Sequence, residues 1–397
     1  MNKMVKFLKW WLFSLWIAAR VKKIRKKEKI RFLFILSELT QWKTELLYQK
    51  MLSHPRFEPI LGITPSRGYK GAERNVIDYC KQKGYSYILL NPTETILSQV
   101  NVDFVMHQKP YNREIHPAHY IDNNKRVPVI PIPYFLSTIT EDWVVNQRVS
   151  FFAWRQFVDN ESCRKAWSKI HKFKGLNYRV TGTPIMDELL TPKEQLKDVW
   201  PINDGRKRII YAPHHTISDF HWEGIAYSTF LEYCQFMLEM RDKYKDKVYF
   251  VFKPHPSLKN RLDKIWGKEK TDSYYLAWEQ TRYSHVASGK YLELFKYSDA
   301  LIHDCGSYTV EYMYTANPVM YLIRDEHHSE NMIPYARKAF DLHYKGFNQA
   351  DIEQFIQDVI NGNDPLKSDR VAYRASFLMP PHGKSACENI IDSILGQ

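Results

Sequence analysis

Short runs of apolar residues recur through this chain, and they constrain its fold more than any other feature. Residues 30–36 read IRFLFIL and residues 57–63 read FEPILGI, and similar runs open the second half at residues 208–213 (RIIYAP) and 248–254 (VYFVFKP). Runs of this length are typical of strands that a parallel sheet buries on both faces. Longer stretches with helical spacing separate them, and this alternation predicts an α/β protein.

The alternation restarts halfway along the chain, which predicts two domains. Residues 191–206 lie between the halves, are polar and contain two prolines and a glycine, so they are the best candidate for a linker. We expect two Rossmann-like domains that face each other across a cleft, at residues 29–190 and 207–397, with the last helix able to pack back on the first domain. Further strands are expected at residues 87–90, 102–106, 127–132, 178–182, 300–304 and 318–323.

Composition and motifs exclude several classes of protein. Of the 397 residues 44% are apolar, which is enough for more than one core and excludes a disordered chain. The five cysteines are widely spaced, with no CxxC pair, so we expect no disulfide framework and no zinc ribbon. The sequence also lacks the motifs of dinucleotide dehydrogenases, P-loop NTPases, zinc proteases and serine hydrolases: GxGxxG, GxxxxGKS/T, HExxH and GxSxG.

The net charge of +13 is concentrated at the N-terminus. Residues 1–31 contain eleven lysines and arginines and one acid, so this segment accounts for +10 of the total. A nucleic-acid-binding protein usually spreads its basic residues over a folded face, and the rest of this chain has no such excess. We therefore expect no nucleic-acid partner.

An uninterrupted apolar stretch of about ten residues lies within the same segment, too short for the ~20 residues that span a bilayer. We predict that residues 1–28 form an amphipathic basic helix at an anionic membrane surface, and that the folded cores begin at residue 30. The aromatic residues of the helix would lie at the level of the lipid headgroups: Trp10, Trp11, Phe13 and Trp16. Two alternatives remain open, a charged tail whose helix packs on the body and a secretory signal.

Polar residues follow three strands of the second half, at the sheet edge where α/β proteins bind ligands. The three clusters are residues 212–216 (APHHT), 253–256 (KPHP) and 303–307 (HDCGS). A single histidine after a strand is more often structural than functional. Three such clusters at successive strand ends, however, favour one shared binding site.

The third cluster has the chemistry of an anion site. Gly306 and Ser307 suit a tight turn from strand to helix, and the first N–H groups of a helix attract negative charge. A plain N-cap role for Ser307 is the structural alternative. Together the clusters would hold a diphosphate, with a carboxylate for ribose hydroxyls. The residues expected on this donor side are Lys253, His214, His215, Gly306, Ser307, Tyr308 and Glu311.

Three segments carry a resemblance to a known family: IIYAPHHT, FVFKPHP and SDALIHDCGSYTVEYMYTANPVMYL. They resemble the CDP-glycerol glycerophosphotransferases, the teichoic-acid and capsule polymerases of the bacterial cell envelope, and the likeness extends over residues 29–397. It implies a GT-B-like α/β fold. It also implies transfer of a polyol phosphate, most often glycerol phosphate, from a CDP-polyol to a hydroxyl of a membrane-linked glycan or teichoic-acid-like acceptor, with release of CMP. The protein would be peripheral, on the cytoplasmic face of the membrane.

The resemblance also assigns roles in the second half. The histidine of the family's motif of the type Arg/Lys-x-His-Pro matches His255, which becomes a catalytic candidate. The family's Asp-Tyr-Ser-Ser motif matches residues 304–307, where Asp304 and Ser307 are retained, and Asp304 is a second catalytic candidate. The family's later acidic residue matches Glu311.

In the first half the sequence departs from the family. The Trp-His-Gly motif is missing near residues 129–137, where Tyr134 stands instead. A base would then come from a histidine of another loop, with His107 as the catalytic candidate beside His116 and His119. The residues expected on the acceptor side are Tyr134, Gly182 and Thr183.

Other readings of the sequence predict different activities. No cluster of carboxylates suggests a magnesium site, so we expect no cofactor and no obligatory metal. A GT-B glycosyltransferase that uses a nucleotide sugar shares the fold and the phosphate site, and it is the alternative enzyme. A non-catalytic membrane- or nucleic-acid-binding protein is the alternative outside enzymes, but it leaves the three strand-end clusters unexplained.

Overall fold

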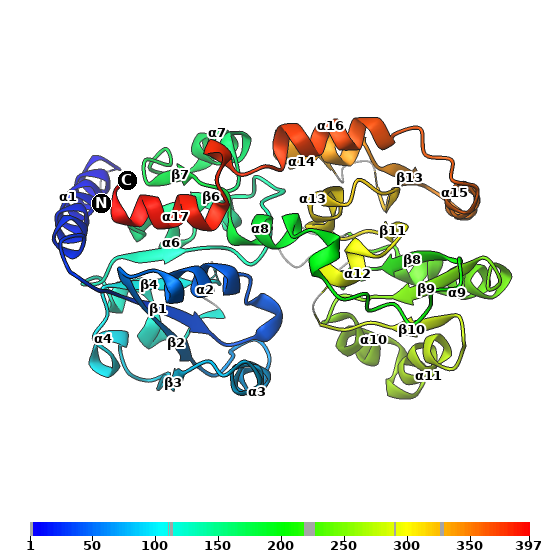
Figure 1. The fold of residues 1–397 in the computed structure, drawn as a ribbon, viewed down its shortest axis with the longest axis horizontal. Coiled ribbons are helices and arrows are strands. Elements are labelled where there is room, and N and C mark those ends of the chain that lie inside the picture. Colours follow the sequence, from blue (N-terminus) through cyan, green and yellow to red (C-terminus); the bar gives the residue numbers. More distant parts are fainter. Residues whose placement is uncertain (1–2, 110, 112–113, 218–226, 290, 326–328) are drawn as a thin grey trace. The chain divides into compact units, whose positions relative to one another are not determined.

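The chain forms two compact units in a computed structural model that describes residues 3–109, 111, 114–217, 227–289, 291–325 and 329–397. Unit 1 comprises Met1–Glu188 and Met379–Gln397, and unit 2 comprises Leu189–Leu378 (Figure 1). The expected linker, residues 191–206, belongs to unit 2, where the indole N–H of Trp200 donates to the Leu294 carbonyl over 3.1 Å. The last nineteen residues belong to unit 1 and not to the expected second domain.

Unit 1 contains a five-stranded parallel sheet in the order β3-β2-β1-β4-β5. Its strands are β1 (Ile30–Leu36), β2 (Phe57–Ile63), β3 (Tyr87–Leu89), β4 (Phe104–His107) and β5 (Val129–Pro131). This order is that of a Rossmann sheet, and the order reverses between β1 and β4, which is the topological switch point where such sheets bind ligands. A separate parallel pair joins β6 (Gln156–Val158) to β7 (Tyr178–Val180).

Nine α-helices with ranges that fall wholly or partly in unit 1 complete its described part. They are α1 (Lys3–Ile24), α2 (Glu45–Ser53), α3 (Glu73–Lys83), α4 (Ile96–Gln99), α5 (Asp142–Val145), α6 (Arg148–Phe152), α7 (Glu161–Ile170), α8 (Pro184–Leu190, which crosses the boundary) and α17 (Ala386–Leu395). The Asn160 side chain caps α7 by accepting from the Cys163 N–H. Gly84 ends α3 in the left-handed conformation that glycine adopts without strain.

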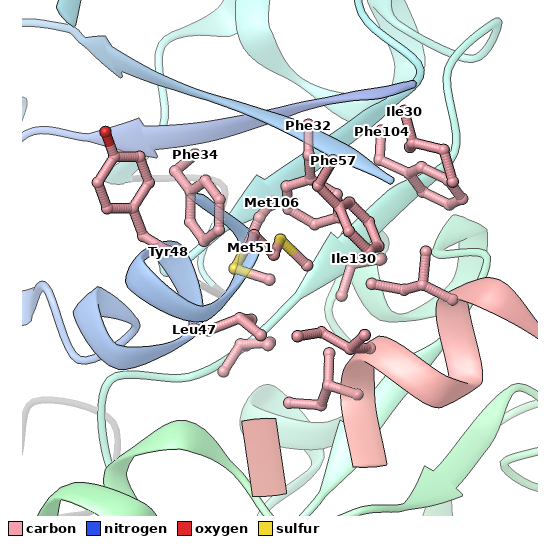
Figure 2. Packing of buried hydrophobic residues seen from close by; sticks show 14 of the residues in the cluster. Ile30, Phe32, Phe34, Leu47, Tyr48, Met51, Phe57, Phe104, Met106 and Ile130 are labelled. Carbon is pink, nitrogen blue, oxygen red and sulfur yellow. The ribbon is translucent and has the colours of Figure 1, made fainter. Parts of the chain in front are cut away.

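The larger hydrophobic core of unit 1 includes the space between the sheet and α2. Figure 2 shows Phe34 and Met106 of the sheet facing Leu47 and Met51 of α2, and all four side chains are buried. The same core includes side chains from both ends of the chain. They are Ile17, Val21 and Ile24 of α1 and Cys387, Ile390, Ile391 and Ile394 of α17.

Helix α1 packs on unit 1 and does not have the division into apolar and basic faces that we predicted. Trp10 is buried and its indole N–H donates to the Phe151 carbonyl over 2.6 Å. The opposite side of the helix is also apolar and is exposed; we call it the exposed strip, and it consists of Leu8, Trp11, Leu12, Leu15 and Trp16. The core therefore begins in α1 and not at residue 30. Among the described residues, no helix has the length and hydropathy needed to cross a bilayer.

Helix α17 is tied to unit 1 at both ends. A capping box between Ser385 and Glu388 starts it, and the carboxylate of Asp187 accepts the N–H groups of Ala386 and Cys387 over 2.7 and 2.8 Å. At its C-terminal end, the Arg25 guanidinium donates to the last carbonyl groups of the helix over 2.8 Å. A cation at this end also matches the helix dipole.

Unit 2 contains a six-stranded parallel sheet in the order β10-β9-β8-β11-β12-β13, again a Rossmann order. Its strands are β8 (Lys207–Ala212), β9 (Val248–Phe252), β10 (Ser284–Val286), β11 (Ala300–His303), β12 (Val319–Leu322) and β13 (Tyr344–Gly346). Its helices are α9 (Phe230–Lys243), α10 (Leu258–Trp266), α11 (Lys268–Glu279), α12 (Leu292–Lys296), α13 (Tyr308–Glu311), α14 (Pro334–Asp341), α15 (Gln349–Asn361) and α16 (Lys367–Phe377). The switch point of this sheet lies between β8 and β11.

Candidate active site

The three polar clusters of the second half meet at the switch point of unit 2. Strand β8 pairs with β9 on one side and with β11 on the other, so the loops that follow these three strands leave the same edge of the sheet. His214 and His215 come from the first loop and His255 from the second. One ring nitrogen from each of the three lies within 4.8 Å of the others, and the ring centroids are 4.1 to 5.0 Å apart.

His255 is held as a hydrogen-bond donor. Its backbone N–H donates to the Pro213 carbonyl over 3.0 Å, and its Nδ1 accepts from the Ser257 N–H over 3.1 Å. Because Nδ1 accepts a hydrogen bond, the proton of the neutral ring is on Nε2. Burial holds the pKa of His255 well below its usual range, and the nearby His215, Arg261 and Lys253 lower it further. The ring is therefore neutral and offers one N–H group.

The neighbours of His255 include a second histidine with a lowered pKa and a buried lysine. Burial, and then the charge of Arg261, lower the pKa of His215 to about 4, and its buried Nδ1 has no hydrogen-bond partner among the described residues. Lys253 is buried and donates to the Gly289 carbonyl over 3.1 Å. An imidazole beside cations binds a proton more tightly when an anion lies close to it.

Three imidazoles at this spacing also invite comparison with a transition-metal site, which needs an unprotonated nitrogen from each ring. His255 does not fit, because its free nitrogen, Nε2, is the one that carries the proton. A metal ligand of this kind donates a hydrogen bond through its other ring nitrogen, whereas Nδ1 of His255 accepts one. The donor set is that of an anion site.

Asp304 positions the loop that carries His214. Its side chain is 0% exposed and accepts hydrogen bonds from the backbone N–H groups of His214 and Thr229, over 2.5 and 2.7 Å. Burial raises the pKa of Asp304 to about 6, although these hydrogen bonds oppose the shift. These contacts show that Asp304 holds the loop of His214 in place, and the catalytic role that we expected for it stays a prediction.

The turn after β11 differs from the expected helix N-terminus. Helix α13 has four residues and continues as a 3-10 turn at Tyr312–Tyr314. Ser307 makes no side-chain cap. Glu311 is buried and accepts from the Tyr291 hydroxyl over 2.6 Å, so its carboxylate already has a partner within the protein.

Gly306 and Tyr308 flank Ser307 in the segment that follows β11. A side-chain carbon at Gly306 would lie 3.2 Å from the Tyr227 ring, so this position favours glycine. The Tyr227 ring also contacts His214, at 5.4 Å between centroids. Tyr308 is half-buried and its ring packs on Tyr291. Of the expected donor-side residues, the structure therefore brings Lys253, His214 and His215 close to His255. Gly306 lies against Tyr227, and the Glu311 carboxylate bonds to Tyr291.

The three candidate bases of the first half lie at the switch-point edge of unit 1. His107 ends β4 and is buried, and burial lowers its pKa to about 3. His119 is also fully buried, and burial lowers its pKa. His116 is half-buried, and its Nε2 donates to the Pro65 carbonyl over 2.7 Å, which leaves Nδ1 to accept a proton. These histidines line a cavity of about 20 Å³, room for about one water.

The residues expected on the acceptor side, Tyr134, Gly182 and Thr183, all have close neighbours within unit 1. Gly182 has a φ of +74°, and a side-chain carbon there would lie 2.9 Å from Ala386 of α17. The hydroxyl of Thr183 is buried and donates to Asp159 over 2.8 Å. Tyr134 is half-buried, and burial raises its pKa well above the usual range, with Glu114 adding to the shift.

Sequence reasoning missed a buried ion pair at the switch point of unit 1. Glu38 follows β1 and Lys109 follows β4, both side chains are less than 10% exposed, and Lys109 Nζ bonds to Glu38 Oε1. The Ser66 hydroxyl donates to the same carboxylate oxygen over 2.5 Å. The signal was present, because both residues stand two positions after a strand, the rule that found the clusters of the second half.

Comparison with solved structures identifies the fold. The wall teichoic acid polymerase TagF, as its H444N variant, matches with a TM-score of 0.63 at 13% identity, covering 99% of this chain and 96% of that one. MnaA of S. aureus with UDP matches with a TM-score of 0.59 at 15% identity, covering 92% and 96%. The UDP-GlcNAc 2-epimerase of Neisseria meningitidis bound to UDP-GlcNAc matches with a TM-score of 0.60 at 15% identity, covering 93% and 100%. These likenesses confirm the predicted GT-B-type α/β fold.

Comparison of sequences identifies the family. No curated protein matches this chain. The sequence profile described as CDP-glycerol:poly(glycerophosphate) glycerophosphotransferase matches residues 140–376, which is more than half of the chain and includes all three strand-end clusters. This match confirms the resemblance drawn from the motifs. The chain belongs to the CDP-glycerol:poly(glycerophosphate) glycerophosphotransferase family.

Proposed function

We propose that this protein transfers glycerol phosphate from CDP-glycerol to a hydroxyl group of a membrane-linked, teichoic-acid-like acceptor and releases CMP. The observation that carries the proposal is the cluster of His214, His215 and His255 at the switch point of unit 2, within the residues that the family profile matches. A TagF variant soaked with CDPG shares the fold of this chain, with a TM-score of 0.62 at 11% identity, covering 99% of this chain and 97% of that one.

The reaction forms one bond and breaks one. The acceptor oxygen attacks the phosphorus that carries glycerol, and the bond from that phosphorus to the bridging oxygen breaks, so the bridging oxygen leaves with CMP. Negative charge grows on the bridging and non-bridging oxygens, where preorganised donors act most strongly. The His255 Nε2–H and the cations Lys253 and Arg261 are the donors that we assign to this charge.

The acceptor proton needs a base, and we assign it to His116 in place of His107. The Pro65 carbonyl fixes the ring of His116 with Nδ1 unprotonated, as a base requires, and the side chain is half-buried and not enclosed. The Glu38–Lys109 pair lies at the same edge of the sheet and offers charged groups to a polyol or its phosphate.

We further propose a monotopic attachment to the cytoplasmic face of the bacterial membrane. The exposed strip of α1 supports it, since Leu12 and Trp16 are 53% and 47% exposed on one side of a helix followed by basic residues. Apolar burial and the attraction of lysines to anionic lipid act together in such attachments. Attachment through α1 would hold unit 1 close to a lipid-linked acceptor.

We propose no obligatory metal, on the basis of the His255 tautomer. Activity in excess chelator would equal activity without it. A stimulation by magnesium that chelator abolishes would contradict this part of the proposal.

A panel of donors tests the activity itself. The full chain is incubated with CDP-glycerol, CDP-ribitol or UDP-GlcNAc and a glycerol-phosphate oligomer as acceptor, and the released nucleotide and the product mass are measured. The proposal expects CMP from CDP-glycerol and a product heavier by one glycerol phosphate per transfer. Release of UDP with sugar transfer would instead identify a glycosyltransferase. If none of the donors led to nucleotide release, the proposal that the protein is an enzyme of this kind would be contradicted.

A further inference from the structure

A groove lies between α1 and the segments around β6 and β7 of unit 1, and it shares no residue with the candidate active site. Its volume is about 210 Å³. Its walls are mainly apolar, with one charged side chain among the described residues that line it. The residues that matter for the argument are Trp11, Leu15 and Ala18 on α1 and Trp154, Arg155 and Leu176 opposite.

The charged side chain is Arg155, and its charge is uncompensated. Its guanidinium lies over the Trp154 ring at 5.5 Å, but it has no hydrogen bond or ion pair with any residue that the structure describes. Burial lowers the pKa of Arg155 to about 10, and the charges of Arg179 and Arg25 lower it further. The guanidinium remains positive at neutral pH, half-buried and close to other cations. An anion is the ligand that this arrangement favours.

The remaining walls of the groove select for an apolar chain. Trp11 and Leu15 are 45% and 49% exposed and belong both to the groove and to the exposed strip. The groove is smaller than the ~300–1,000 Å³ of pockets that enclose a compact small molecule. A flexible hydrocarbon chain that enters from the side of the exposed strip fits such a groove, whereas a nucleotide does not.

We propose that this groove binds one anionic phospholipid, with its phosphate at Arg155 and an acyl chain along Trp11, Leu15 and Trp154. The inference rests on the proposed attachment of α1 to the membrane and adds lipid selectivity to it. The exposed strip would enter any bilayer, but the groove requires a negative phosphate and a chain in the same molecule.

A titration with a monomeric lipid tests the proposal directly. The full chain is titrated by calorimetry with dihexanoyl phosphatidic acid below its micelle concentration, and we expect one saturable site. Dihexanoyl phosphatidylcholine has the same chains without the net charge, and inorganic phosphate has the charge without the chains. Each should bind at least about tenfold more weakly to the groove. Equal binding of phosphatidylcholine, or equal binding of phosphate alone, would overturn the proposal.

Two substitutions locate the site, and a third is the control. Arg155→Gln removes the charge, and Ala18→Phe fills the groove at an exposed position of α1 without changing the charge. Each substitution should weaken the binding of dihexanoyl phosphatidic acid at least about tenfold. Arg164→Gln removes the same charge from an exposed arginine that pairs with Glu161, and it should bind as the wild type does. Circular dichroism checks that all three variants fold.

If both Arg155→Gln and Ala18→Phe bind phosphatidic acid as tightly as the wild type, the groove is not a lipid site. The titration involves no turnover. If the protein releases CMP from CDP-glycerol but does not bind the lipid, only the proposed lipid site is refuted. If it binds the lipid but releases no CMP, only the proposed activity is refuted.

Discussion

The backbone N–H of Ser257 donates to Nδ1 of His255 over 3.1 Å, and this contact decides which ring nitrogen carries the proton. Ser257 immediately precedes α10, so the geometry that starts the helix also orients the imidazole. A neutral histidine with its proton on Nε2 is a directed donor for a phosphate oxygen. Exchange of this residue should therefore affect the chemical step.

We predict that His255→Ala lowers kcat at least about 100-fold, because it removes a donor aimed at charge that develops in the transition state. Initial rates of CMP release from CDP-glycerol measure the effect. His285→Ala is the matched control, since His285 lies in unit 2 and contacts the Tyr249 hydroxyl outside the cluster. Near wild-type turnover of a folded His255→Ala variant would show that the residue is structural and that the site lies elsewhere.

Donor affinity should increase as the pH falls. In the free protein the pKa of His215 is about 4 and that of His255 is also depressed, so both rings are neutral at pH 7. A bound diphosphate raises both pKa values, so binding takes up protons, and affinity rises from about pH 8 to about pH 6. Calorimetry with CDP-glycerol in buffers of different ionisation enthalpy measures the uptake. A pH-independent affinity without proton uptake would contradict the anion-site assignment.

Deletion of residues 1–28 should unfold unit 1. The deletion removes Ile17, Val21 and Ile24 from the core, each worth about 1.5–3 kcal/mol of burial, against a typical stability of about 5–15 kcal/mol. It also removes the Arg25 contacts to the end of α17. Solubility and circular dichroism of the truncated chain test this. A soluble truncated protein with native melting would mean that the unit 1 core is complete without α1.

Substitution of the exposed strip should instead separate membrane binding from folding. Leu12→Gln with Trp16→Gln changes two exposed side chains outside the groove, so melting should be unchanged while sedimentation with anionic vesicles falls. Leu52→Gln on α2 is the matched control, because Leu52 is 56% exposed in the same unit. If the double variant still sediments as the wild type does, the attachment surface lies outside this strip.

The buried Glu38–Lys109 pair predicts a strong effect on stability. Glu38→Ala leaves Lys109 buried without its partner and should destabilise unit 1 by about 3–5 kcal/mol. Glu38→Leu with Lys109→Met removes both charges and should recover most of that loss. Thermal unfolding of the three proteins measures both effects, with CDP binding by unit 2 as the control. Equal melting of Glu38→Ala and the wild type would show that the pair contributes little.

Most strands could be predicted from the sequence, because a parallel strand that is buried on both faces is a continuous run of apolar residues. The run at residues 30–36 is β1, and the run at 57–63 is β2. His214 and His255 follow the carboxyl ends of neighbouring parallel strands, and they lie together at one edge of the sheet as expected. The short strands β10 and β13 were missed, since three residues at a sheet edge carry too little pattern.

Roles that depend on distant neighbours were harder to predict. Asp304 holds its loop partly through a hydrogen bond from Thr229, which lies 75 residues away in the chain. His107 looked like a loop histidine in the sequence, but pairing of β4 with β1 and β5 buries it. The Glu38–Lys109 pair spans 71 residues, so the place of each residue after its strand does not reveal that the two side chains pair. Burial and pairing of this kind follow from the assembled fold and not from spacing.

The return of α17 to unit 1 has a consequence for biosynthesis. Domains of multidomain proteins generally fold as the ribosome delivers them, N-terminal first. Here the ribosome completes Leu189–Leu378 before it makes the helix that fills the core of unit 1 with Cys387, Ile390 and Ile394. Unit 2 is therefore complete on the ribosome before unit 1 is, although unit 1 begins first. A premature stop after residue 378 would leave a nascent chain whose first domain stays open, as a substrate for chaperones and proteases.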